Sequence, residues 1–524
     1  MNKLVMLYEE NKKYLSLFVI WFFLWAGLNT KFPDDWDRLL TNPIAQINTA
    51  RFFCLYLIPI FFYFYFFLKK THKFNFNLIL ICIFGYFLSQ MIGFANFKFL
   101  NPTLFMQTEA MEDLIVNGYN LRFSYSFYTS FALLLPLPLM AIIIKDEDSS
   151  KKILFFSILI LASITFLYSV KIFHEFINSD KLNLYYLSFL TWGYFFDMPA
   201  PRATGAGRWY LILYIFLLSL IFFHKNEKKK FLYFILLILA GSMVYLFQSR
   251  SSIYFLFLSN FVVFFRPKKL LNSFVMFSLL TVLIPLNSAL ILKIRDYTYL
   301  QTLKKDQVFL FLKDEINQEL ANDKLELSED DLKYIESLGR LDYRELKDKE
   351  VLEKLAKFYY QKRKSNIKDD RILEVKKGMF QITTGRNEIW KDIIYYSIGL
   401  QNSNFIFGYG PQADRYLVFQ NASNGFMYVL ICSGIIGLFI FLTLLIKLLI
   451  IFLKIIFNYN ILIQNNHLKF YHVFAMVCII FFGLRLIVEN SFTVYGLDYL
   501  LFLSCFGVIF NLFLKVESTS RKIY

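Results

Sequence analysis

Residues that bind metal ions are scarce in this sequence. It contains five cysteines and five histidines, and no cluster combines the two types. Among the histidines, only His174 falls in a segment that we assign below to the external side of a membrane. We therefore expect no structural disulfide, no metal site and no cofactor. The cysteines all lie inside apolar segments, without a partner at motif spacing: Cys54, Cys82, Cys432, Cys478 and Cys505.

The cleavage site of a removable signal peptide is also lacking near the first apolar segment. The first apolar segment, near residues 14–28, follows Lys12 and Lys13 and has no cleavage site made of small residues. We expect it to be retained as a membrane helix.

Apolar residues dominate what is there. Of the 524 residues, 57% are hydrophobic and 20% are aromatic. Apolar runs of about 17 residues or more recur along the chain, which is more than a soluble core can hide. The formal net charge of +16 comes from Lys and Arg in short clusters between these runs, so it indicates membrane topology and not a nucleic-acid partner. The sequence predicts an all-α, polytopic membrane protein.

The apolar runs predict about twelve transmembrane helices of about twenty residues each. Every second connection is a basic cluster, as in 69–73, 145–152, 225–230 and 266–269. By the positive-inside rule those loops and both termini are cytoplasmic, which requires an even number of spans. The predicted spans lie near 14–28, 52–68, 76–94, 123–144, 153–170, 208–223, 231–247, 252–265, 271–292, 424–453, 470–488 and 498–514.

This topology divides the chain into three parts. Residues 1–292 hold about nine spans, residues 293–423 form a long external segment, and residues 424–524 hold about three spans. Within the external segment, Ser328 and Asp331 resemble a capping box, and apolar residues further on repeat at helical spacing. We predict a small helical subdomain over 301–380, with a structural role as a lid or scaffold.

The stretch from Thr384 to Gly437 combines polar residues, glycines and the start of a membrane span. Arg386 and Trp390 share a helical face, because four residues separate them. Gly408 and Gly410 lie in a turn whose backbone N–H groups are expected to approach a ligand. Arg415 and Asn424 follow before the span begins. An anionic, partly apolar ligand would suit this stretch.

Further arginines lie at the predicted external boundary. Arg202 and Arg208 flank a glycine-rich turn that opens a span, where a phosphate can bind the N–H groups of a helix N-terminus. Arg250 lies between two spans with almost no loop, and Arg485 is four residues from Glu489. A purely structural role stays open for each of them. Arginines at such positions also extend to the membrane surface, stay solvated, anchor a helix or form a structural ion pair.

These residues carry a resemblance. The pattern of Gly385-Arg386, Trp390, Gly-x-Gly, Asn424 and then Ser433 to Gly437 resembles the bacterial O-antigen polymerase and O-antigen ligase superfamily. The resemblance covers the arginine-bearing turns and the second half of the chain, but hardly residues 1–120. It implies a GT-C-like glycosyltransferase architecture in the inner membrane, with the active site facing the periplasm. It also implies a donor and an acceptor linked to undecaprenyl pyrophosphate, and it leaves room for a chain-length regulator as a partner.

The chemistry of glycan transfer fits the arginines. A pyrophosphate leaving group gains negative charge as the anomeric bond breaks, and fixed guanidinium groups stabilise that charge without a divalent cation. The residues predicted to bind pyrophosphate are Arg202, Arg208, Arg250, Arg386, Arg415 and Arg485, with Asn424, Gly408 and Gly410 positioning the loop or the glycan. The candidate bases are Glu489, Asp392, Asp414 and His174, although no base is needed if bond breaking runs ahead of attack.

Three alternatives remain beside a polymerase. The ligase branch of the family usually has His where this chain has Ser423, and the missing imidazole favours the polymerase. A metal-dependent glycosyltransferase using a polyprenyl-phosphate sugar is the second alternative, with Asp34, Asp35 and Asp37 as its cation site. A transporter of lipid-linked oligosaccharides is the third, although it would not explain the long external segment.

Overall fold

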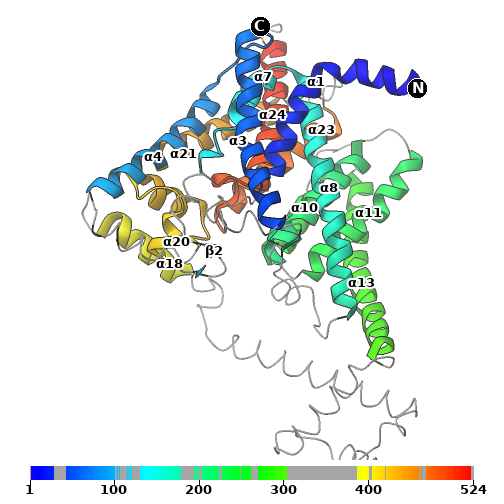
Figure 1. The fold of residues 1–524 in the computed structure, drawn as a ribbon. Coiled ribbons are helices and arrows are strands. Elements are labelled where there is room, and N and C mark those ends of the chain that lie inside the picture. The colour runs from blue at the N-terminus through cyan, green and yellow to red at the C-terminus, as the bar shows by residue number, and fades with distance from the viewer. Residues whose placement is uncertain are drawn as a thin grey trace, which may run out of the picture.

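The computed structural model is built almost entirely of helices, as predicted (Figure 1). In the described parts, the strands are two-residue pairs that form two small antiparallel hairpins, β1 (Ile115–Val116) with β2 (Tyr119–Asn120) and β3 (Tyr194–Phe195) with β4 (Met198–Pro199). The structure describes residues 2–28, 43–100, 103, 106, 115–116, 119–120, 130–178, 194–195, 198–199, 203–223, 227–247, 250–260, 270–303, 386–399, 404–418, 421–458, 462 and 468–520.

Seven helices in these ranges are long and apolar enough to cross a membrane, and three shorter apolar helices accompany them. A helix is the expected form, because it satisfies its own backbone hydrogen bonds where no water is available. The seven lie within α3 (Pro43–Lys69), α4 (Leu78–Leu100), α8 (Glu147–Asn178), α11 (Glu227–Leu246), α13 (Leu270–Leu303), α21 (Gly425–Phe457) and α24 (Leu497–Ser520). The shorter ones lie within α1 (Asn2–Ala26), α10 (Ala203–Phe223) and α23 (Phe470–Arg485).

These helices coincide in position with ten of the predicted spans, and the seven long ones support a multi-pass helical membrane protein, whereas the predicted total of twelve spans stays a prediction. The other two predicted spans, 123–144 and 252–265, are described only in part, as α7 (Pro136–Ile143) and α12 (Arg250–Ser259). The helix α13 continues to Leu303, beyond the predicted end of its span at residue 292. The predicted subdomain at 301–380 and the acidic turn at 34–37 lie outside the described residues, apart from the last turn of α13.

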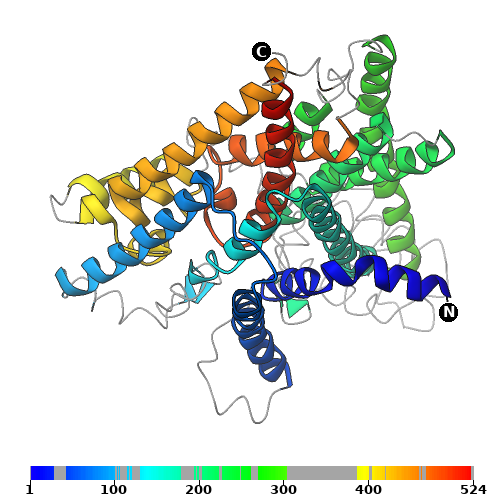
Figure 2. The ribbon, with the colours of Figure 1, turned by 90° about the horizontal axis from the view of Figure 1, so that it is seen from above.

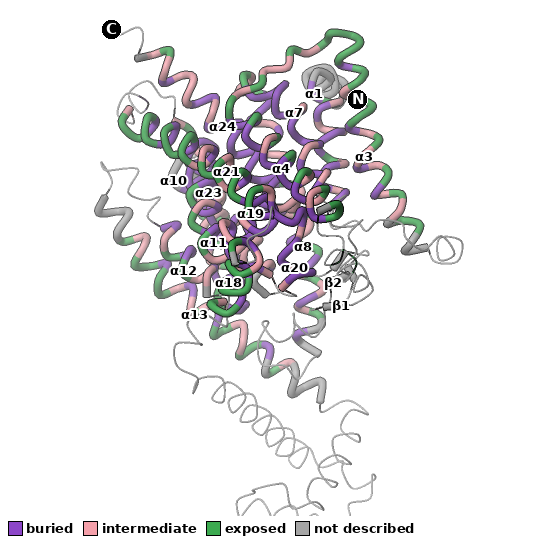
Figure 3. Tube along the Cα trace, turned by 90° about the vertical axis from the view of Figure 1, so that its left-hand side faces the viewer, coloured by how far each residue is buried: buried purple, intermediate pink, exposed green. Residues whose placement is uncertain are grey.

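The helix α24 forms the centre of the bundle. Within its apolar window 83% of the residues are buried, against 17% for α13 at the periphery. Its neighbours are α8, α21 and α23, and Asn511 in α24 donates a hydrogen bond to Ser150 Oγ at 3.0 Å. Buried residues gather along these helices in Figure 3, whereas outer faces such as that of α18 (Arg386–Ile394) are exposed. A central helix enclosed by others is suited to hold polar residues away from lipid.

Contacts between helix ends occur at both ends of the bundle and show which loops lie at the same end. At one end, Lys515 Nζ of α24 lies 2.5 Å from Glu147 Oε2 of α8, and Tyr471 of α23 donates to Glu147 Oε1 at 2.9 Å. At the other end, Arg51 of α3 donates to the carbonyl oxygens of Ala26, the last residue of α1, and of Leu28, two residues later. The predicted alternation of loops requires this grouping. Figure 1 places the start of α1 and the end of α24 on one side, with α18 and the end of α13 on the other.

Two groups of helices flank α24 (Figure 2). On one side, α4 and α21 lie along each other and carry α18, α19 (Asn404–Phe407) and α20 (Ala413–Leu417) at their ends. On the other side, α10, α11, α12 and α13 pack together. The polar stretch singled out in the sequence belongs to the first group, and Arg208 and Arg250 belong to the second.

Candidate functional site

A small second core holds the polar stretch in place. Phe97 of α4 packs edge to face against Tyr409, with ring centroids 5.2 Å apart, and stacks on Tyr416 at 6.4 Å. Ile389 and Ile393 of α18 are buried in the same cluster. This core is distinct from the main core around α24. It holds the polar, glycine-containing stretch against α4 and α21.

The helix α21 is interrupted at Gly434, whose φ of 63° and ψ of −163° are not helical. An interruption frees carbonyl groups of the preceding turn, which must find other donors inside a membrane. The turn at 408–410 supplies them, because Tyr409 N donates to Ile431 O and Gly410 N donates to Cys432 O, both at 2.9 Å. Gly408 N donates to Asn404 O at 2.6 Å.

These contacts correct the predicted role of the glycine turn. Its backbone N–H groups are used within the protein, so they are not available to a ligand. The glycines remain necessary, since Gly408 and Gly410 have φ values of 77° and 94°. A methyl group on Gly408 would lie 2.5 Å from the Cys432 carbonyl carbon. The turn therefore fixes the start of the loop that follows it, and a role of these glycines in positioning a glycan stays a prediction.

The residues Asn421–Gly425, which we call the junction segment, connect three parts of the site. Trp390 Nε1 of α18 donates to Ala422 O at 2.9 Å, and Asp414 Oδ2 of α20 accepts from Ala422 N at 2.8 Å. Two residues later, Asn424 Oδ1 caps α21 by accepting from the N–H groups of its first turn, at 2.9 and 3.1 Å. Asn424 Nδ2 donates to Ile487 O at 2.9 Å.

The junction segment thus joins the helix that begins with Arg386 to the end of α23, where Arg485 lies. Gly425 N strengthens the link by donating to Leu486 O at 2.7 Å. Ser423 lies between these contacts, half-buried and with a φ of 49°, which is uncommon for a residue other than glycine. Asn424 is therefore hydrogen-bonded to the short backbone segment that lies between Arg485 and Glu489.

Four charged residues, three from α10, α23 and α24 and one from the turn after α23, meet beside this link, and we call them the arginine–carboxylate cluster: Arg208, Arg485, Glu489 and Asp498. Arg208 Nη1 lies 2.7 Å from Asp498 Oδ2, and Arg485 Nη1 pairs with the same oxygen. Arg485 Nη2 pairs with Glu489 Oε2, as the spacing of four residues predicts. The guanidinium of Arg485 and the carboxylate of Asp498 are almost fully buried.

The cluster corrects one local prediction and reveals one missed residue. The glycine-rich stretch before Arg208 is not a turn, because α10 already begins at Ala203. Asp498, which holds both arginines, was not among the predicted site residues. An acid in the first turn of an apolar span is itself a signal, since a buried charge needs a partner.

Arg386 and Arg415 occupy different environments. Arg386 begins α18 with a half-buried side chain, and among the described residues it has no hydrogen bond or ion pair. Desolvation lowers the pKa of its guanidinium, which still stays charged because Arg titrates far above neutral pH. Arg415 Nε lies 4.0 Å from Asp414 Oδ2, so its charge offsets the buried carboxylate. Of these two, Arg386 is the better candidate for an anionic ligand.

The candidate bases differ in exposure. Asp414 is fully buried and tied to Ala422, and burial raises the pKa of its carboxyl despite the opposing effect of Arg415. Asp392 is exposed on α18, and His174 is exposed near the end of α8. Glu489 is paired with Arg485 and 24% exposed. Access by a substrate is therefore open to Glu489, Asp392 and His174 but not to Asp414.

Arg250 is the first residue of α12 and follows the end of α11 at Leu246 after a very short connection, as predicted. The structure describes its backbone only. Arg202 lies outside the described residues. Their predicted roles in binding pyrophosphate stay predictions.

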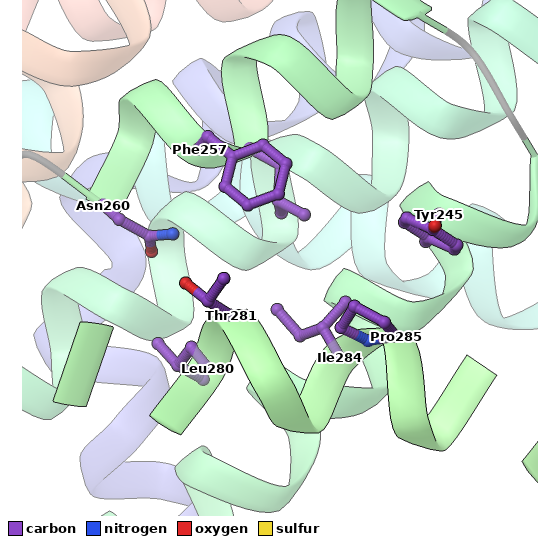
Figure 4. Close-up of a pocket in the computed structure, with 8 residues that line it drawn as sticks. Tyr245, Phe257, Asn260, Leu280, Thr281, Ile284 and Pro285 are labelled. Atoms are coloured by element: carbon purple, nitrogen blue, oxygen red, sulfur yellow. The ribbon is translucent and has the colours of Figure 1, made fainter. Parts of the chain in front are cut away.

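A shallow cleft lies between α11, α12 and α13 (Figure 4). Its walls include Phe257, Leu280, Ile284 and Pro285, with Asn260 and Thr281 as polar groups. No charged residue lines it, so it does not suit a pyrophosphate. The chemically distinctive part of the described structure is the arginine–carboxylate cluster with the junction segment.

No protein-family model, curated protein or solved structure matches the chain. Within the described ranges, no three His, Cys, Asp or Glu side chains come together in a way that could hold a metal ion. The site combines guanidinium groups, a capped helix start and accessible carboxylates at one end of a helical membrane protein. Such a set is suited to binding an anion and moving a proton next to it.

Proposed function

We propose that this protein is a polymerase of a bacterial surface polysaccharide. It transfers a growing glycan from undecaprenyl pyrophosphate to the next lipid-linked repeat unit, at the periplasmic face of the inner membrane. In this proposal the chain has twelve spans with both termini in the cytoplasm, and residues 293–423 lie in the periplasm. The O-antigen ligase, which transfers the glycan to lipid A-core, is the runner-up.

One observation carries the proposal. The junction segment links α18, which begins with Arg386, to the end of α23, which ends with Arg485. Arg208 reaches the same end through Asp498. The paired guanidinium groups of Arg208 and Arg485 and the helix that begins with Arg386 thereby belong to one connected framework at one end of the bundle. Fixed cations are suited to stabilising the charge that develops on a departing pyrophosphate.

The residues divide the work in the proposed reaction. The arginines bind the pyrophosphate oxygens through their planar N–H groups, and Asn424 keeps the two ends of the framework in register. Glu489, which follows α23, and Asp392 on α18 are accessible enough to take the proton of the attacking hydroxyl. Asp414 holds the junction segment by accepting a hydrogen bond from Ala422 N, and it takes no part in proton transfer.

A transporter of lipid-linked oligosaccharides is the second candidate, because transporters often contain interrupted helices and α21 is interrupted. In transporters the freed backbone groups line the substrate path. Here they are bonded to the 408–410 turn, so the break serves the packing of the loop. We therefore rank transfer above transport.

Deletion of the protein in its host separates these functions. A polymerase-deficient strain should make lipopolysaccharide capped with a single repeat unit, since ligation continues while extension stops. Loss of all capping would identify the ligase instead. An unchanged ladder would remove the protein from the pathway.

Substitutions test the arginines in the same strain. Arg386→Lys and Arg250→Lys keep the charge but lose the planar fork, so chain extension should fall by about a hundredfold. Lys391→Arg is the control, because Lys391 is an exposed cation on the same helix, α18, as Arg386. Wild-type extension in both Arg→Lys variants would exclude these residues from pyrophosphate binding.

A further inference from the structure

The two carboxylates of the arginine–carboxylate cluster are not equivalent. Asp498 is 4% exposed and its Oδ2 pairs with both Arg208 and Arg485, so it holds the two arginines together. Glu489 is 24% exposed and pairs with Arg485 alone. It lies in the turn that follows α23 and not within a helix. The Glu489 side chain thus has room to rotate away from Arg485, whereas Asp498 is enclosed and pairs with two arginines.

The charges of the cluster already balance, with two guanidinium groups and two carboxylates. A pyrophosphate adds negative charge to a poorly solvated site, which is costly unless one carboxylate leaves. The arginines keep donors for such a ligand, since Arg208 Nε is buried without a hydrogen-bond partner. Freed from Glu489, Arg485 Nη2 would offer a further donor at the exposed edge of the cluster.

We propose that Glu489 occupies, in the unliganded protein, the place on Arg485 that a phosphate group of a polyprenyl diphosphate takes on binding. The ligand displaces the Glu489 side chain, while Asp498 keeps Arg208 and Arg485 side by side. Glu489 is thus a competitor of the diphosphate for Arg485, in addition to its candidacy as a base. The inference rests on the proposed function and assigns a new role to one residue of its site.

Apolar surface beside the cluster favours a lipid diphosphate over a free one. Leu484 and Ile487 lie on either side of Arg485 in the sequence and are 42% and 54% exposed. A polyprenyl chain can cover such side chains while its diphosphate reaches Arg485. The shared chemistry is the diphosphate, and the lipid tail distinguishes the two sources.

The test is a binding measurement on the full chain in lipid nanodiscs by isothermal titration calorimetry, with farnesyl diphosphate as the probe. Inorganic pyrophosphate and farnesol serve as partial probes. Glu489→Gln should bind farnesyl diphosphate about tenfold more tightly than the wild type, because a charged competitor is removed. Asp498→Asn is the matched control, since it removes a carboxylate from the same arginine. It should bind more weakly, because the arginines are no longer held together.

The test depends on the opposite changes in affinity expected for Glu489→Gln and Asp498→Asn. Tighter binding by both variants would reveal a general charge effect and overturn displacement, as would equal or weaker binding by Glu489→Gln. If Asp498→Asn does not yield folded protein, Glu388→Gln, which removes an exposed carboxylate from α18, takes its place: unchanged binding in this variant supports displacement, and binding as tight as in Glu489→Gln overturns it. Equal binding of inorganic and farnesyl diphosphate by the wild type would overturn the lipid assignment. Tightened binding in a protein that extends no glycan would keep the displacement and overturn the proposed polymerase, so the two failures are distinguishable.

Discussion

Gly434→Ala probes the arrangement that positions the junction segment. With a φ of 63° and a ψ of −163°, residue 434 has a backbone conformation that is essentially restricted to glycine, and an alanine there costs about 1–3 kcal/mol in strain. The new methyl group would also lie 2.6 Å from Gly408 N, so the 408–410 turn must shift. Its hydrogen bonds to Ile431 O and Cys432 O would weaken, which costs about 1–3 kcal/mol for the pair. The sum is about 2–6 kcal/mol.

Cys432 reports this change, because it is fully buried two residues before the break. A loss of about 2 kcal/mol in local stability raises the open population about thirtyfold, so a thiol reagent should modify Cys432 at least that much faster. Mass spectrometry of the labelled peptide gives the rate in detergent-solubilised protein. Gly483→Ala is the control, since no atom lies within 4 Å of its added methyl group. Equal labelling rates in the two variants would refute the role assigned to Gly434.

Three further predictions concern single contacts and the topology. Asn424→Asp keeps the acceptor for the first turn of α21 but loses the donor to Ile487 O, so glycan extension should fall. Its thermal stability should change less than that of Asn424→Ala, which also loses about 1 kcal/mol of capping. Full activity of the Asp variant would count against the link. Burial raises the pKa of Asp414 in the folded chain, so stability should decrease as the pH rises from the ordinary Asp pKa through the raised one. Thermal unfolding measured at a series of pH values should show a smaller decrease for Asp414→Asn. An equal dependence of stability on pH in the variant and the wild type would contradict this prediction. A membrane-impermeant thiol reagent should label Asn387→Cys, which is exposed on α18, but not Ser520→Cys in intact spheroplasts; labelling at residue 520 alone would invert the topology.

Helices and their neighbours were predictable from the sequence to different degrees. Apolar runs of sufficient length give spans such as 153–170 and 498–514, because the bilayer leaves the backbone no alternative to a helix. The break at Gly434 was not predictable, since glycine is common in membrane helices and only the docked turn at 408–410 requires it. The turn itself was recognised from its glycines, but the partners of its N–H groups were assigned to a ligand instead of to α21.

In the site, contacts were predictable only between residues that are close in the sequence. The pair of Arg485 and Glu489 follows from helical spacing, so the sequence was sufficient for it. Asp498 lies 290 residues from Arg208, and no local pattern connects them. The contact of Asn424 with Ile487 likewise joins two spans that are separate in the sequence. Tertiary packing decides which charged residues meet, whereas the sequence only shows that each needs a partner.

The most direct test of the proposed function is polymer synthesis by the purified protein in liposomes that contain a lipid-linked repeat unit as donor and acceptor. Products are separated by gel electrophoresis, with and without a chelator of divalent cations. We expect a ladder of extended glycans in both conditions, and none from Arg485→Gln. Synthesis that stops with the chelator would favour metal-dependent transfer. A wild-type protein that moves the lipid-linked unit across the bilayer without extending it would contradict a polymerase and support the transporter.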